Sequence, residues 1–296
     1  MESEILRFGD YIKTKKKMAN NSVTAYLRDI REYTAFLSEK GAADPREATE
    51  ADLAAYLLKL KQENRTAATV NRKLAAVRAF YKYMNAVGRM ASNPSVEIKT
   101  PKITRKEIEF LSLEEIDRLI TSPDKSPKGI RDTAILELLY ATGLRVSELV
   151  EANVDDINLR MGFISCNGEH GKARIIPLGR PARAALETYI FEGRAKLRRN
   201  KSDQEKALFL NYYGERLTRQ ALWKILKGYA EELGIEKKLT PQIIRNTFAV
   251  HMIQNGADLK SLQELLGHED LAATQIYLSV SKNKIKDVYD KTHPRA

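Results

Sequence analysis

Three residues near the C-terminal end of the chain have side chains that could together transfer a phosphoryl group. Within residues 239–278, Arg245 lies on one predicted helix, His268 follows the end of a second, and Tyr277 lies on a third. A guanidinium can neutralise phosphate oxygens, an imidazole can donate hydrogen bonds to them, and a phenol can attack phosphorus. Short connections join the three helices, so we expect these side chains to share one site. The alternative is structural, since a tyrosine on a terminal helix is normally a packing residue.

A fourth candidate, Arg145, comes from a separate stretch, ATGLRVSEL at residues 141–149. Gly143 ends the preceding predicted helix, and Ser147 to Val150 can begin the next, so Arg145 lies at a junction between helices. Most arginines form exposed ion pairs that contribute little. The apolar residues around Arg145 favour a directed role instead.

Two further positions could contribute to the same chemistry. Gln242 precedes Arg245 by three residues and therefore lies on the same helix face. Lys172 and His170 lie in or beside the turn NGEHGK, which joins the last two predicted strands. A lysine in a loop is usually just solvated, so a catalytic role for Lys172 needs support from elsewhere.

Metal and cofactor sites are not expected. The chain has 4 histidines and 1 cysteine, which are too few for a zinc module. Cys166 is the single cysteine, so an intrachain disulfide is excluded. The sequence also lacks a P-loop, the usual sign of nucleotide use.

The hydrophobic pattern predicts a mainly α protein with two domains. Four helical patterns fill residues 3–90 and predict a small bundle over residues 1–90. A basic, proline-containing linker follows at 91–109. Residues 110–296 are predominantly helical, with a small antiparallel sheet predicted from the segments 154–157, 162–166 and 173–178.

The charge balance indicates a polyanionic partner. Lysine and arginine outnumber the acids by 50 to 39, giving a net charge of +11. The polar face of the fourth predicted helix carries four cations that could contact DNA, with an ordinary solvated helix face as the alternative. These candidates are Arg72, Lys73, Arg78 and Lys82.

The sequence gives no sign of a membrane partner. No apolar run approaches the length that spans a bilayer, and the first residues carry charges where a signal peptide needs an apolar core. We therefore expect a cytoplasmic protein.

Together these motifs resemble the tyrosine recombinase (phage integrase) family, most closely its XerC/XerD type. ATGLRVSEL resembles the first arginine motif of the family and implies Arg145 as that arginine. LLGHEDLAATQIYL resembles the final histidine–tyrosine motif, with His268 and Tyr277 nine residues apart. Arg245 matches the second arginine. The correspondence covers nearly the whole chain and implies a SAM-like core-binding domain followed by a catalytic domain.

The resemblance implies a metal-free transesterification. Tyr277 would attack a DNA phosphate, leaving a 3′-phosphotyrosyl link and a free 5′-hydroxyl. Arg145, Arg245 and His268 would bind the non-bridging oxygens, and Lys172 would protonate the leaving oxygen. The implied partners are double-stranded DNA and further protomers in a tetramer on two DNA sites. This tetramer is either a homo-tetramer or a hetero-tetramer with a paralogous recombinase. The C-terminal segment 279–296 would dock on a neighbouring protomer.

Two departures from the family pattern leave alternatives open. Gln242 stands where the family usually has histidine, and Glu169 stands where direct register would place the lysine. Glutamine cannot exchange a proton near neutral pH, so we expect a slow or partner-activated enzyme. One alternative is a catalytically weakened DNA-binding subunit that needs an active partner, and another is a relaxing enzyme of the type IB topoisomerase kind. The task could be resolution of chromosome dimers or integration and excision of mobile elements.

Overall fold

The computed structural model describes residues 2–41, 44–90, 92–102, 107–167, 173–198 and 205–278. The chain divides into two compact units, residues 1–106 and 107–296, and each is described by itself. The hairpin residues Glu169, His170 and Lys172 lie outside the described residues, as does the predicted docking segment 279–296. Within the described part of the chain, no helix is both long and apolar enough to cross a membrane.

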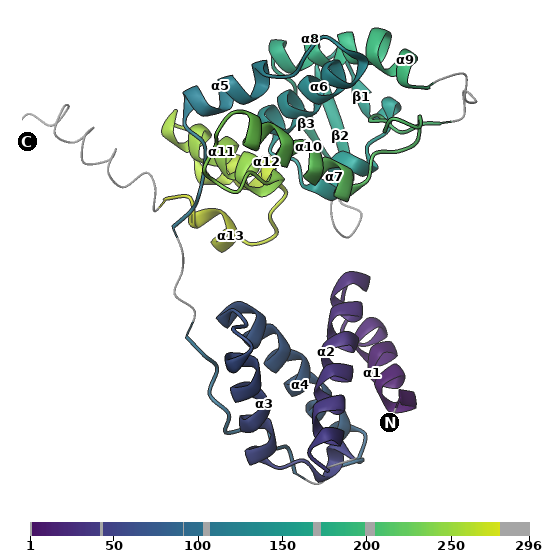
Figure 1. The fold of residues 1–296 in the computed structure, drawn as a ribbon, viewed down its shortest axis with the longest axis vertical. Coiled ribbons are helices and arrows are strands. Elements are labelled where there is room, and N and C mark those ends of the chain that lie inside the picture. The colour runs from purple at the N-terminus through teal and green to yellow at the C-terminus, as the bar shows by residue number, and fades with distance from the viewer. Residues whose placement is uncertain are drawn as a thin grey trace, which may run out of the picture. The chain divides into compact units, whose positions relative to one another are not determined.

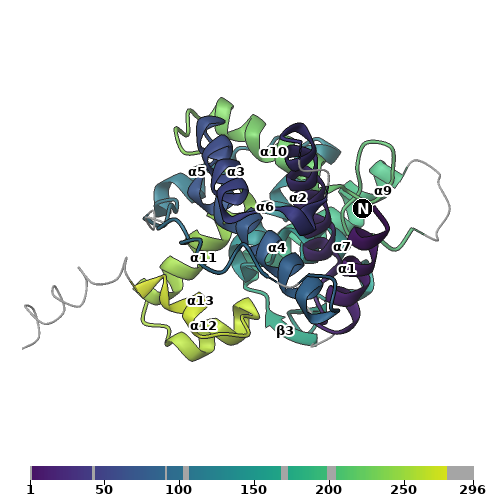
Figure 2. The same ribbon diagram turned by 90° about the horizontal axis from the view of Figure 1, so that it is seen from below.

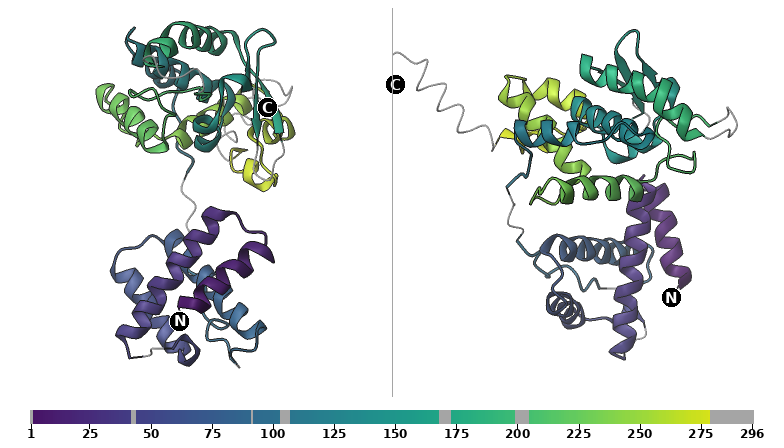
Figure 3. Two further views of the ribbon diagram at one scale, coloured as in Figure 1. Left: turned by 90° about the vertical axis from the view of Figure 1, so that its right-hand side faces the viewer. Right: turned by 45° about the horizontal axis from the view of Figure 1, so that its top comes forward.

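The N-terminal unit is a helical bundle (Figure 1). Its elements are α1 (Glu2–Thr14), α2 (Asn20–Glu39), the short 3-10 helix η1 (Pro45–Glu47), α3 (Glu50–Gln62) and α4 (Ala67–Ala86). Helix α2 contacts both α1 and α4 (Figure 3). Tyrosines fill much of the interior, and the hydroxyls of Tyr33 and Tyr81 are hydrogen-bonded at 2.8 Å. This pairing satisfies two polar groups that would otherwise be costly to bury.

The C-terminal unit is also mainly helical and contains one three-stranded sheet. The strands pair in the order β1-β2-β3, and both pairings are antiparallel. The structure thus confirms the predicted fold class, a mainly α protein with a small antiparallel sheet. Its elements are α5 (Leu113–Thr121), α6 (Pro127–Thr142), α7 (Val146–Glu151), η2 (Val154–Asp156), β1 (Ile157–Asn158), β2 (Phe163–Asn167), β3 (Ala173–Pro177), α8 (Arg180–Thr188), the π-helical turn η4 (Tyr189–Gly193), α9 (Arg194–Arg198), α10 (Arg219–Glu232), α11 (Pro241–Gln254), α12 (Leu259–Leu266) and α13 (Ala272–Gln275).

Helix α6 is the central helix of this unit and contacts α5, α8, α9 and α11. Its inward face carries fully buried leucines and an isoleucine that join the main hydrophobic core. Helix α12 in turn contacts α11, α13 and strand β3, so these elements lie together (Figure 2). Elements far apart in the sequence thereby meet around the C-terminal ends of α6 and α12.

Two left-handed glycines end α6 and α12. Gly143 has φ of 59° and Gly267 has φ of 62°. This left-handed backbone conformation is energetically unfavourable for residues that have a Cβ. A Cβ on Gly143 would also lie 2.5 Å from Cδ1 of Phe248. Both turns therefore require glycine, and each places a candidate residue, Arg145 or His268, directly after a helix end.

Replacing Gly143 with alanine should destabilise the protein by at least about 2 kcal/mol, because the left-handed backbone and the contact with Phe248 both oppose a Cβ. Gly228 is a matched control, since it lies inside α10 with no atom within 4 Å of an added Cβ. Gly228→Ala should stabilise by roughly 0.5–1 kcal/mol. Urea unfolding measures both changes, and equal effects of the two substitutions would contradict the requirement for glycine at position 143.

Candidate active site

Arg245 lies on α11, whose start is fixed by Thr240, the N-cap that accepts a hydrogen bond from the amide of Ile243 at 3.1 Å. The side chain is almost fully buried, with the residue only 3% exposed. Its guanidinium donates to the carbonyl oxygen of Gly143 and, at 2.8 Å, to that of Leu266. Burial and the nearby charge of Arg145 lower the pKa of Arg245 to about 10, so it stays protonated at neutral pH.

Arg145 lies at the junction between α6 and α7 and reaches the same turn. Its Nη2 donates to the carbonyl of Gly267 at 2.8 Å, and its Nη1 donates to Glu148 at 3.2 Å. The two arginines are therefore held by successive carbonyls, those of Leu266 and Gly267, at the end of α12. Guanidinia in this arrangement can exchange their carbonyl acceptors for phosphate oxygens.

His268 is fixed through both ring nitrogens. Nε2 lies 3.0 Å from Nη2 of Arg245, and Nδ1 lies 2.9 Å from the hydroxyl of Thr274. A guanidinium can only donate, so Nε2 accepts and the ring proton is on Nδ1. Burial, followed by the charges of Arg245 and Arg145, lowers the pKa of His268 from 6.5 to about 4. The imidazole is therefore neutral at neutral pH in the absence of an anion.

Tyr277 follows α13 and is 2% exposed. Its hydroxyl donates to Oδ1 of Asn246 at 3.2 Å, and Gln242 donates to the same oxygen at 2.9 Å. Burial raises the pKa of the Tyr277 phenol, although the charge of Arg245 partly opposes this. The structure thus connects Tyr277 to Gln242 through Asn246, and the hydrogen bonds described above connect Arg145, Arg245 and His268 to one turn.

Sequence reasoning missed two residues that organise the arginines. Both carboxylate oxygens of Glu148 bind the guanidinium of Arg174, at 2.6 and 2.9 Å, and Oε2 accepts from the backbone amide of Arg145 at 2.7 Å. Arg174, on β3, also donates to the carbonyl of Leu265 at 3.0 Å. Burial opposes ionisation of Glu148, but the bonds from Arg174 and Arg145 outweigh it and hold the Glu148 pKa below its ordinary value.

The spacing of Glu148 three residues after Arg145 is that of a capping box, and this signal could have identified it. Arg174 carries no such local signal. Its contact with Glu148 depends on the register of the hairpin and on the packing of β3 against α12.

The four DNA-binding candidates of α4 differ in exposure and therefore in how accessible they are to a phosphate. Lys73 is 4% exposed and its ammonium pairs with Asp29 and Glu32, so it is not placed to reach a phosphate. Arg72 also pairs with Asp29, and the Arg78 side chain donates to Ile98 and Thr100. Lys82 is exposed. These ion pairs favour a structural role for Lys73, and its contact with DNA stays a prediction.

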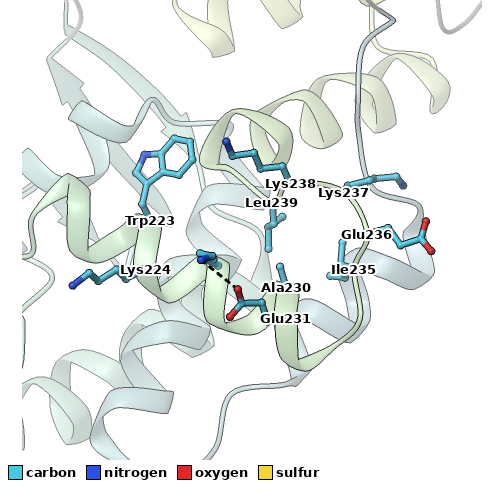
Figure 4. A pocket seen from close by; sticks show the side chains of 10 residues that line it. Trp223, Lys224, Ala230, Glu231, Ile235, Glu236, Lys237, Lys238 and Leu239 are labelled. Carbon is cyan, nitrogen blue, oxygen red and sulfur yellow. Dashed lines mark ion pairs between the residues drawn. The ribbon is translucent and has the colours of Figure 1, made fainter.

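A groove of about 340 Å³ lies between α10 and the segment that precedes α11 (Figure 4). Trp223, Ile235 and Leu239 give it an apolar floor, and several lysines line it as well. None of the candidate site residues that the structure describes lines it. In the described part of the chain, no group of three or more His, Cys, Asp or Glu residues could hold a metal ion.

The model of the phage integrase family matches residues 109–284, and the model of the N-terminal SAM-like domain of phage integrases matches residues 5–88. The chain belongs to the phage integrase family. This recombinase is 44% identical to the tyrosine recombinase XerD of Listeria monocytogenes serotype 4b (strain F2365), and the match covers 100% of both chains. It is 39% identical to the tyrosine recombinase XerC of Roseiflexus sp. (strain RS-1), over 95% of this chain and 90% of the other.

The fold is shared with a solved structure, the XerH site-specific recombinase bound to palindromic difH substrate in a post-cleavage complex. The TM-score is 0.72 at 19% identity, and the match covers 96% of this chain and 94% of XerH. Both domains of the recombinase thus have the architecture that the sequence predicted.

The low pKa of His268 makes stability pH-dependent. The unfolded chain binds a proton at this residue below pH 6.5, whereas the folded protein does so only near pH 4. The contribution of neutral His268 to stability is therefore present above pH 6.5 and is lost as the pH falls toward 4. The difference in unfolding free energy between wild type and His268→Gln should shrink from about pH 7.5 to about pH 5 in urea titrations. A difference that is independent of pH would rule out a neutral, buried His268.

Lys73 and Lys82 should give opposite results when substituted. Lys73→Met leaves the fully buried Asp29 with one cation fewer and should destabilise the protein by roughly 3 kcal/mol, with no change in the salt dependence of DNA binding. Lys82→Ala should change stability by less than about 0.5 kcal/mol and reduce the slope of log K against log salt by about 1. Binding titrations at several salt concentrations separate the two, and a reduced slope for Lys73→Met would restore its role as a DNA contact.

Proposed function

We propose that this site-specific recombinase cleaves and rejoins DNA through Tyr277, with Arg145, Arg245 and His268 as the phosphate-binding residues. The observation that carries the proposal is the convergence of Arg145 and Arg245 on one turn, with His268 in contact with Arg245. Two permanently charged guanidinia supply the charge that a transferring phosphoryl group needs. The buried phenol of Tyr277 lies near enough to Arg245 for its charge to affect the pKa of Tyr277.

The proposed reaction proceeds in two balanced steps. The Tyr277 oxygen attacks phosphorus, the bond from phosphorus to the 5′-oxygen breaks, and the phenol loses its proton while the leaving 5′-oxygen gains one. The 5′-hydroxyl of a partner strand then attacks the 3′-phosphotyrosine and releases Tyr277. The covalent link conserves the energy of the phosphodiester bond, so no nucleotide hydrolysis is required.

Proton transfer is the least complete part of the proposed site. Gln242 can donate a hydrogen bond but cannot take or give a proton near neutral pH. Direct register places Glu169 where the family has its lysine, so we propose Lys172, three residues further along the sequence, as the acid that protonates the leaving oxygen. We therefore propose a slow or partner-activated enzyme. The second candidate function, a DNA-binding subunit that depends on an active partner, is favoured by the two departures in the sequence, Gln242 and Glu169.

For its biological role, we propose resolution of chromosome dimers, because the relative at 44% identity carries the name XerD. The proposed working form is a tetramer on two DNA sites, either of this chain alone or together with a paralogous recombinase. The DNA-bound XerH complex on a palindromic site supports binding of more than one protomer. We propose the cytoplasm as its location, since that is where chromosomal DNA lies in bacteria.

Covalent capture tests the proposed chemistry. A duplex selected for binding from a random library would be nicked near the cleavage position, so that the released fragment diffuses away and the protein stays attached. Wild type should form a denaturation-resistant complex, and Tyr277→Phe should form none. Failure of the wild type to trap this duplex, with or without its partner, would contradict the proposal.

The same assay measures the effect of Gln242. If the missing proton transfer limits the reaction, Gln242→His should raise the single-turnover rate of capture by about 10²-fold or more. Gln242→Ala is the matched control. It removes a hydrogen-bond donor and adds no group that transfers protons, so its capture rate should be lower than that of wild type. A rate for Gln242→His within about threefold of wild type would show that Gln242 does not weaken the enzyme.

A further inference from the structure

Asn246 connects three parts of the catalytic unit. Its Oδ1 accepts hydrogen bonds from the hydroxyl of Tyr277 at 3.2 Å and from Gln242 at 2.9 Å. Its Nδ2 donates to the backbone carbonyl of Glu109 at 3.1 Å. An amide oxygen has two lone pairs, and both are used here. The side chain thus links the nucleophile to the last residue of the basic linker.

A second contact fixes the same segment to α11. The backbone amide of Leu111 donates to the hydroxyl of Thr247 at 2.9 Å, and Thr247 is fully buried. Consecutive residues of α11 therefore bind Glu109 and Leu111. Ile108 and Phe110, which flank Glu109, pack against the hydrophobic cluster that contains Tyr277. A hydrogen-bond path thus joins the segment 107–111 to the nucleophile, and both belong to the same hydrophobic cluster.

The contact between Asn246 and Tyr277 does not activate the phenol. An amide oxygen accepts the hydrogen bond without taking the proton, so the oxygen of Tyr277 stays protonated. The phenol is also buried, which raises its pKa. To attack a phosphate, the Tyr277 oxygen must leave Asn246 or give up the proton that it donates there. The observed contact is therefore a docked arrangement of the nucleophile.

We propose that Asn246 is a positioning residue that couples the nucleophile to the end of the linker. It holds Tyr277 docked while the carbonyl of Glu109 stays in place, and a shift of the segment 107–111 when the linker engages DNA frees the phenol. This inference rests on the proposed role of Tyr277 as nucleophile. It adds a residue that acts through Tyr277 and touches no DNA itself.

The docking can be measured in the full-length protein without DNA. Incorporation of 3-fluorotyrosine labels all 13 tyrosines, and the 19F resonance of Tyr277 is the one that Tyr277→Phe removes. Asn246→Ala should shift this resonance, because the hydroxyl loses its acceptor. Asn246→Asp keeps an acceptor for the hydroxyl but cannot donate to the carbonyl of Glu109, so the coupling predicts a smaller shift of the same resonance. Asn255→Ala, which removes an amide at the end of the same helix, should leave the resonance unchanged.

Hydrogen exchange measures the proposed coupling between Tyr277 and the segment 107–111. Tyr277→Phe should speed exchange of the backbone amides of residues 107–111, although it lies far away in the sequence, because Asn246 loses one of its two donors. Asn246→Asp should speed the same amides, since a carboxylate cannot donate to the Glu109 carbonyl. Unchanged exchange in both variants would overturn the coupling.

The rate of covalent capture on DNA shows whether docking restrains Tyr277 during the reaction. Asn246→Ala should raise the single-turnover rate of capture by roughly three- to tenfold, since one hydrogen bond no longer restrains the phenol, without a change in affinity for DNA. A lower rate together with an unmoved Tyr277 resonance would overturn docking. The fluorine and hydrogen-exchange measurements are made without DNA and do not depend on catalysis. If the variants show both the shifted Tyr277 resonance and the faster exchange of residues 107–111, but wild type traps no DNA, only the proposed function is contradicted.

Discussion

The site depends on an imbalance of charge: three guanidinia surround one carboxylate. Glu148 binds Arg174 and Arg145, while Arg245 is buried and, among the residues that the structure describes, has no carboxylate as a hydrogen-bond partner. Instead of a carboxylate, carbonyl oxygens at the C-terminal ends of α6 and α12 accept hydrogen bonds from Arg245 and Arg145. Helix C-termini carry partial negative charge, so they can hold a cation that lacks a full counter-ion. A phosphate that displaces these carbonyls gains charge-assisted hydrogen bonds to groups that are already in position.

The same cations determine which groups carry protons before DNA binds. They combine with burial to keep His268 neutral, and they oppose only part of the effect of burial on Tyr277. The resting site therefore holds a neutral imidazole and a protonated phenol. An anion among the arginines would favour the imidazolium, because opposite charges stabilise each other at short range. DNA is thus expected to alter the protonation of its own binding site as well as to occupy it.

The sequence was informative where local patterns determine the structure. Gly143 and Gly267 end helices in the left-handed conformation, which the sequence pattern alone predicts. These helix ends determine where Arg145 and His268 lie. The burial of Lys73 could not be predicted from helical spacing, because its ion pair with Asp29 joins it to another helix. Arg174 and Asn246 could not be found in this way. Their contacts join segments about 26 and 31 residues apart in sequence, and only tertiary packing brings these together.

If Tyr277 is the nucleophile, it carries the covalent link to DNA, and the decisive measurement is to locate that link in the protein. A trapped complex would be digested with nuclease and protease, and the modified peptide would be sequenced by mass spectrometry. The expected adduct is a nucleotide joined through its 3′-phosphate to Tyr277 and to none of the other tyrosines. An adduct on another residue, or one joined through a 5′-phosphate, would contradict it.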